Sequence, residues 1–240
     1  MARLISMPVG LAPRAMAPLS GPRAVGGASS TTTGSFNQTV ASPFGSWRWQ
    51  FTFPVSKDAK FRRYRGWVTA LHAGANATRV PFGDPDMMTL LEAGISASPA
   101  QERLGMPWGN DEPWSNGQNW AVTAPNVGLA AVAEIDTTII RLQDSFWGHR
   151  LQPGDYLGFF PLHFGLYTVT EERGSGEYRI WPPLRKALTT GDFATLYPVL
   201  AMRLESEDAA SAVRGVAYAE EATVTLVEVF DYDARDYFTD

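Results

Sequence analysis

The sequence predicts a mostly β fold, and three observations support this. Glycine and proline are plentiful (22 and 17 of 240 residues) whereas charged residues make up only 19%, a composition that favours short strands and turns over long amphipathic helices. Hydrophobic residues reach 45%, so the chain can bury a sizeable core. The segment from Trp47 to Phe53 alternates large apolar and polar residues, which is the period of a half-buried strand.

The first half of the chain contains the clearest elements. The alternation in residues 47–53 places aromatic side chains on one face of a strand. Residues 61–71 carry apolar side chains every three or four positions, which predicts a helix that ends by Gly74. Residues 77–82 read as a second strand, because the turn-like Gly83-Asp84-Pro85 follows them.

The second half is rich in strands and turns. A turn at 151–155 precedes a strand at 156–160, and residues 166–170 pair with 177–181 across Gly174-Ser175-Gly176, a pattern typical of a small β-barrel or sandwich. Strand composition also marks the segments 127–142, 195–204 and 222–230, with a polar loop at 206–215. The predicted core residues along the outer elements are Trp47, Trp49, Phe51, Phe53, Trp67, Leu71, Val224, Leu226 and Val229.

Residues 87–118 form a predicted long loop, because their periodicity fails and Gly, Pro, Asn and Trp dominate. Three tryptophans lie in or beside it: Trp108, Trp114 and Trp120. We expect them to be buried anchors that hold an irregular loop in place. A glycan platform is the alternative interpretation.

The two ends of the chain carry opposite charge. Residues 1–57 contain five basic residues and no acid, whereas residues 204–240 contain ten acids and two arginines. Residues 1–35 also lack any helical or strand period, which indicates an extended arm or a disordered tail. A basic arm and an acidic tail on one chain suit a head-to-tail contact between subunits. The candidate interface residues are Arg3, Arg14, Arg23, Arg62 and Arg63 on the basic side and Asp231, Asp233 and Asp236 on the acidic side.

No arrangement typical of catalysis is visible in the sequence. Asp84 and Asp86 flank a proline in a turn, and the adjacent pairs Glu171-Glu172 and Glu220-Glu221 would point to opposite faces of a strand, so none reads as a catalytic pair. No nucleophile with its base and no nucleotide-binding glycine motif is visible either. The chain has no cysteine and three dispersed histidines, so we expect no metal and no cofactor. A net charge of −5 argues against nucleic acid as a partner, and the apolar stretches are too short for membrane insertion. We therefore expect a protein that is not an enzyme.

Several segments, read in order, resemble a family of siphophage or gene-transfer-agent-like distal tail proteins. The first is Ser42-Pro-Phe-Gly45 followed by the aromatic strand 47–54. The second is the helix end at 67–71 with the strand 74–81, where His72-Ala73 departs from the arginine often found in the family. The others are 151–156, 167–170 and 178–185, and the closing strand 223–230.

This resemblance implies a nested layout and an assembly role. It implies a β-sandwich-like outer domain with one helix, at residues 36–85 plus 193–232, interrupted by a small OB-like β-barrel at 86–192. An arm at 1–35 and an acidic tail at 233–240 flank them. Family members resemble adaptor rings, usually hexamers, that join the tail tube protein to baseplate hub or fibre proteins at the virion tail tip, after synthesis in the bacterial host cytoplasm. The alternatives are a carbohydrate-binding β module of a tail tip and a tail-associated cell-wall hydrolase.

Overall fold

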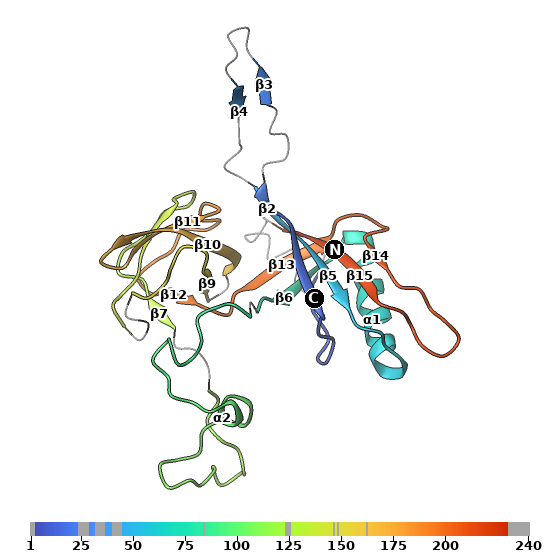
Figure 1. Ribbon diagram of the computed structural model, residues 1–240, viewed down its shortest axis with the longest axis horizontal. Coiled ribbons are helices and arrows are strands. Elements are labelled where there is room, and N and C mark those ends of the chain that lie inside the picture. The colour runs from blue at the N-terminus through green and yellow to red at the C-terminus, as the bar shows by residue number, and fades with distance from the viewer. Residues whose placement is uncertain are drawn as a thin grey trace. The chain divides into compact units, whose positions relative to one another are not determined.

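The computed structural model describes residues 3–23, 29–31, 37–39, 45–83, 85–122, 126–145, 147, 149–161 and 163–229. Most of its regular structure is β-strand, which confirms that the fold is mostly β (Figure 1). The chain divides into two compact units. Unit 1 comprises Met1–Phe82, His163–Leu166 and Val199–Asp240, and unit 2 comprises Gly83–Leu162 and Tyr167–Pro198.

A seven-stranded sheet forms the centre of unit 1. Its strands run in the order β1-β6-β13-β15-β5-β2, and β14 also pairs with β15. All pairs are antiparallel except β1 with β6. The strands are β1 (Leu4–Ser6), β2 (Ala15–Arg23), β5 (Ser46–Phe53), β6 (Ala77–Pro81), β13 (Val199–Leu204), β14 (Ala210–Ser211) and β15 (Ala222–Glu228). A separate pair consists of β3 (Ser29–Thr31) and β4 (Asn37–Thr39).

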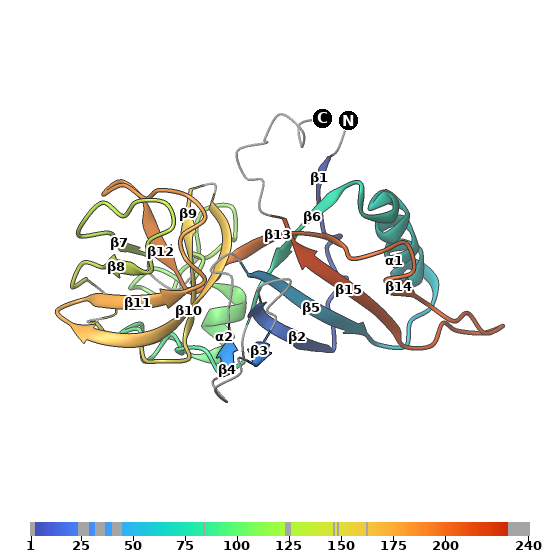
Figure 2. The ribbon, with the colours of Figure 1, turned by 90° about the horizontal axis from the view of Figure 1, so that it is seen from above.

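Helix α1 (Asp58–Ala70) covers one face of this sheet (Figure 2). A 3-10 turn, η1 (His72–Gly74), follows the helix. Tyr64 and Trp67 of α1 are buried and meet the ring of Phe53 edge-on, at centroid distances of 5.4 and 5.8 Å. The indole N–H of Trp67 donates to Thr78 Oγ1 of β6 at 3.1 Å. Aromatic packing between helix and sheet therefore forms the core of unit 1.

A six-stranded sheet forms unit 2, in the order β7-β12-β9-β10-β11-β8. Its strands are β7 (Val127–Gly128), β8 (Ile139–Arg141), β9 (Tyr156–Phe160), β10 (His163–Gly174), β11 (Glu177–Trp181) and β12 (Phe193–Thr195). The first four residues of β10 belong to unit 1. Trp147, Tyr167 and Tyr178 are among the largest fully buried side chains of its core. The long connection before β7 contains helix α2 (Pro99–Leu104).

The main predicted elements are confirmed. Strand β5, helix α1, strands β6, β9 and β11 and the β10–β11 hairpin lie within a few residues of the predicted ranges. Eight of the nine predicted core residues are buried. Val229 is the exception, since it is half-buried while the neighbouring Glu228 is only 3% exposed.

Three segments differ from their predictions. The expected arm at 1–35 contains β1 and β2 within its described part, and these strands pair with β6 and β5. The predicted strand at 195–204 is split between β12 of one sheet and β13 of the other. The segment 127–142 is strand only at β7 and β8. In each case, whether a segment forms a strand, and in which sheet, depends on the strand that it pairs with and not on its own sequence pattern alone.

Candidate functional site

The three loop tryptophans form a cluster on the surface of unit 2. The rings of Trp108 and Trp114 lie 5.1 Å apart between centroids, Trp108 and Trp120 lie 5.5 Å apart, and Trp114 and Trp120 lie 4.9 Å apart. Their exposed fractions are 46%, 41% and 48%. The three tryptophans are therefore not buried, and the interpretation as buried anchors is wrong on this point. Each ring does pack against the other two.

Backbone hydrogen bonds hold these three residues together. Met106 and Trp120 bond to each other in both directions, at 2.8 and 2.9 Å. Trp108 N donates to Glu112 O at 2.9 Å, and Trp114 N donates to Gln118 O at 2.7 Å. The Met106–Trp120 pair thus closes one loop, and two short turns follow each other inside it. Each turn begins with a tryptophan of the cluster.

The start of this loop is anchored by helix α2. Ser98 accepts a hydrogen bond from Gln101 N at 3.2 Å, and the Gln101 side chain accepts one from Ser98 N at 2.8 Å. Pro99 occupies the first helical position. This is a capping box, and Ser98-Pro99-x-Gln101 is its sequence signal, which the prediction of a plain loop at 87–118 overlooked.

A tryptophan that serves only as an anchor loses stabilising free energy when it is exposed. Each ring leaves on the order of 100 Å² in solvent, which at about 25 cal/mol per Å² forgoes about 2.5 kcal/mol of burial per side chain. Two of the core tryptophans of this chain behave differently. Trp47 and Trp67 are 2% and 3% exposed, and their indole N–H groups donate to Leu166 O and Thr78 Oγ1. No described residue accepts a hydrogen bond from the indole N–H of a clustered tryptophan.

Several polar side chains lie on the same loop as the cluster. Asn110 donates to Glu112 at 3.3 Å, Asn116 donates to Gln118 Oε1 at 3.1 Å, and Asn119 donates to Leu104 O at 3.2 Å. A hollow of about 420 Å³ adjoins them, and its lining residues are Leu104, Gly105, Gly117, Gln118, Asn119, Ala121 and Val122. Its size lies within the range of small-molecule sites.

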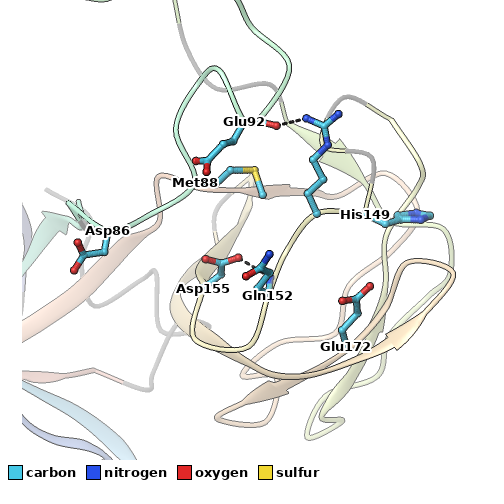
Figure 3. Close-up of a pocket in the computed structure, with 8 residues that line it drawn as sticks. Asp86, Met88, Glu92, His149, Gln152, Asp155 and Glu172 are labelled. Atoms are coloured by element: carbon cyan, nitrogen blue, oxygen red, sulfur yellow. Dashed lines mark hydrogen bonds between the residues drawn. The ribbon is translucent and has the colours of Figure 1, made fainter.

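A second pocket of about 450 Å³ lies elsewhere in unit 2 (Figure 3). Asp86, Glu92, Asp155 and Glu172 supply carboxylates to its lining, beside His149 and Arg150. Glu92 accepts hydrogen bonds from Thr89 N and Thr89 Oγ1, both at 2.8 Å, and these bonds hold its pKa below the ordinary value. Asp155 accepts a bond from Gln152 N at 2.7 Å. Local turns therefore account for these two carboxylates without a ligand.

The predicted interface residues lie in several places. Arg14 forms an ion pair with Glu221 of the same chain, and Arg63 Nη1 donates to Val9 O at 3.1 Å. Arg3 precedes β1 and its backbone N–H donates to Asn76 at 2.9 Å, while Arg23 ends β2. Arg62 is exposed on α1. Asp231, Asp233 and Asp236 lie outside the described residues. The structure therefore uses Arg14 and Arg63 within one chain.

An exposed apolar hairpin in unit 1 was not found by sequence reasoning. It occupies residues 212–221 between β14 and β15, where Gly215 N donates to Tyr218 O at 2.9 Å and Glu220 N donates to Val213 O at 2.9 Å. Val213, Val216 and Tyr218 are 61%, 105% and 52% exposed. Val55, at 55%, precedes Ser56, which bridges Ala219 of the same hairpin.

Within the described ranges, no three His, Cys, Asp or Glu residues are grouped so that they could hold a metal ion. Among the same residues, no helix has the length and apolar character needed to cross a bilayer. No protein-family model matches the chain. No curated protein sequence matches it either.

Proposed function

We propose that this chain is a structural protein of the tail tip of a long-tailed phage or phage-derived particle, where it forms an adaptor ring between the tail tube and the hub or fibres. In this proposal unit 1 is the sandwich-like, ring-forming part and unit 2 is an OB-like insertion. The ring is a homo-hexamer, and the chain carries out no catalysis.

The exposed hairpin at 212–221 is the observation that carries the assembly role. Its valines and tyrosine, together with Val55, present apolar side chains on a tightly hydrogen-bonded turn. Exposed apolar side chains gathered in one region of a folded chain are one mark of a protein–protein interface. A closed ring uses two different surfaces of each subunit, so the hairpin of one copy meets another surface of its neighbour.

The ordered sequence motifs support the tail-tip setting. The aromatic strand, helix and closing strand of the resemblance correspond to β5, α1 and β15: the two strands are neighbours in the sheet of unit 1, and the helix covers one face of that sheet. The sheet itself provides limited opportunity for edge pairing, because edge strand β2 contains Pro18 and two register shifts. Side-chain contacts are therefore the more suitable means of joining copies.

Light scattering and negative-stain imaging of the purified chain test this proposal. We expect rings of six copies whose formation weakens when Val216→Asp places a charge on the hairpin tip. Val132→Asp is the matched control, since Val132 is 61% exposed in unit 2 and lies outside the hairpin. A chain that remains monomeric at low and high salt and at high concentration contradicts the ring, and rings that tolerate Val216→Asp contradict the role of the hairpin.

A further inference from the structure

We infer that the tryptophan cluster of unit 2, formed by Trp108, Trp114 and Trp120, is a binding site for a neutral oligosaccharide. The inference does not depend on the assembly role. It follows from three properties of one bridged loop: exposed aromatic faces, polar groups beside them, and the absence of cationic side chains.

The aromatic faces match the apolar face of a sugar ring. A pyranose in its chair form presents axial C–H groups on a face and hydroxyls around the rim. An indole accepts the C–H face as an apolar contact and offers its N–H to a hydroxyl, so one side chain meets both kinds of surface. Three tilted rings within 5.5 Å of one another offer differently oriented faces to successive sugar units.

The amides supply hydrogen bonds of both senses. A hydroxyl both donates and accepts, and so does a primary amide, which makes Asn and Gln suitable partners. Gln118 and Asn119 line the hollow of about 420 Å³ beside the cluster, and Asn116 bonds Gln118 in place at 3.1 Å. The hydrogen bonds within the loop orient these groups and leave part of their capacity unused.

The charge of the loop selects an uncharged ligand. Residues 104–122 contain no Lys, Arg or His, and Asp111 and Glu112 are their two acids. Phosphate and carboxylate groups need cationic or N–H-rich partners, and here they would meet two acids instead. Neutral hexoses and N-acetylhexosamines remain compatible with the loop.

Binding of chitohexaose and maltohexaose to the full chain, measured by calorimetry, tests the inference, with polygalacturonate as an anionic comparison. We expect at least one neutral hexasaccharide to bind with a Kd of about 1 mM or tighter, and polygalacturonate not to bind. The response to the two probes separates acetamido from plain hydroxyl recognition. Trp114→Ala should weaken binding at least about tenfold, which corresponds to about 1.4 kcal/mol.

Two further variants separate recognition from loop folding. Trp114→Phe keeps an aromatic face and should retain part of the affinity, and Gln118→Ala should reduce affinity while leaving the cluster in place. Tyr197→Ala is the control, because Tyr197 is 42% exposed in unit 2 but lies away from this loop in the chain. The inference is overturned if neither hexasaccharide binds at about 10 mM, if Trp114→Ala binds as the wild type does, or if it reduces self-association instead.

Discussion

At the residue scale, the tryptophans of this chain have two different environments. Trp47, Trp49 and Trp67 occupy the core of unit 1, whereas the loop tryptophans lie at the surface. The alternating pattern of a strand identifies the burial of Trp47 and Trp49, and the spacing of apolar residues by three or four in a helix identifies that of Trp67. No period surrounds the second group, and for this reason its exposure could not be predicted from the sequence.

Trp49→Ala should be strongly destabilising. Trp49 is 4% exposed and packs against Phe82 and Trp47, with ring centroids 5.0 and 5.9 Å away. Loss of a buried aromatic of this size costs about 3 to 5 kcal/mol, because the site collapses only in part. Denaturant unfolding measures the change. The exposed-aromatic control Tyr197→Ala should stay within about 0.5 kcal/mol, and equal effects of the two changes would contradict the strand's orientation.

The burial of Glu228 follows from the alternation of its strand, although glutamate is a residue type usually found at the surface. The strict alternation of β15 buries Ala222, Val224, Leu226 and also Glu228. The Glu228 carboxyl group accepts a hydrogen bond from Trp47 N at 3.0 Å, so this buried polar group has a partner. The prediction of Val229 as a core residue was based on its hydrophobicity. The register of the strand instead directs the side chain of Glu228 into the core.

The free energy of unfolding should fall steeply between pH 10 and pH 12. Burial raises the pKa of Tyr64 to about 12, and burial together with the charge of Glu172 raises the pKa of Tyr178 to about 12. An unfolded tyrosine has a pKa near 10, so in this window the unfolded chain releases protons that the folded chain retains. Stability present below pH 10 is therefore lost as the pH rises through 12.

Urea unfolding at several pH values measures this loss, and phenolate absorbance of the folded chain follows the titration directly. The double variant Tyr64→Phe Tyr178→Phe has no proton to release at either position, so its stability should depend less on pH over the same range. If the double variant and the wild type lost stability in parallel, these two tyrosines would not be its source.

At the scale of elements, short hydrogen-bonded turns determine much of the fold. The β10–β11 hairpin was predicted because Gly174-Ser175-Gly176 separates two strand-like runs, and the structure confirms that turn. Gly174, Ser175 and Gly176 all have positive φ, at 86°, 54° and 78°. Glycine at the two outer positions is the residue type that adopts this conformation without strain.

Gly176→Ala should destabilise the chain more than Gly174→Ala. Both changes place a Cβ on a left-handed backbone, which costs about 1 to 2 kcal/mol. At Gly176 that Cβ would also lie 2.4 Å from Leu142 O and 2.5 Å from His149 Nε2, whereas nothing lies within 4 Å of it at Gly174. The added clash should cost about 1 to 3 kcal/mol more. Thermal unfolding of the two variants measures the difference in stability. Identical transitions would show that the backbone at Leu142 moves away from the added Cβ at no measurable cost.

Strands β1 and β2 show the limit of local patterns. Their sequences, Leu-Ile-Ser and Ala-Met-Ala-Pro-Leu-Ser-Gly-Pro-Arg, have no sustained alternation, so neither the period nor the composition indicates a strand. Pairing with the regular strands β6 and β5 supplies their structure. Edge strands of this kind depend on a neighbour far along the chain, and single-sequence reasoning therefore assigns them to an arm.

At the scale of the whole molecule, unit 2 is inserted between two neighbouring strands of unit 1. Strands β6 and β13 are antiparallel partners, and Pro81 pairs directly with Val199. Apart from His163–Leu166, the residues between Phe82 and Val199 belong to unit 2, and Phe82 and Val199 lie at adjacent positions of one sheet of unit 1. An insertion at such a point leaves the register of the sheet intact, because a hairpin turn could join the same two strands.

Unit 1 should therefore fold after residues 83–198 are replaced by Asn-Gly-Thr. Asn-Gly favours the two-residue hairpin turn that restores a direct β6–β13 connection, and the threonine takes the place of Pro198 opposite Phe82, where the turn needs a backbone N–H donor. The excised chain should show β-type circular dichroism and a cooperative thermal transition. It should also be less stable than the full chain, because the deletion removes His163–Leu166, and with them the Leu166 carbonyl that accepts the Trp47 indole N–H at 2.6 Å.

Trp47→Phe in both backgrounds isolates that contribution. In the full chain the substitution breaks the bond and leaves a buried carbonyl without its donor, at a cost of about 1 to 3 kcal/mol beyond the lost packing. In the excised chain the carbonyl is already gone, so the same substitution should cost less, and the difference between the two costs is the coupling energy of the pair. An excised chain without a cooperative transition would mean that unit 1 requires the removed residues, either those of unit 2 or its own His163–Leu166, to fold. Equal costs in both backgrounds would mean that the Trp47–Leu166 bond contributes nothing measurable to the stability of unit 1.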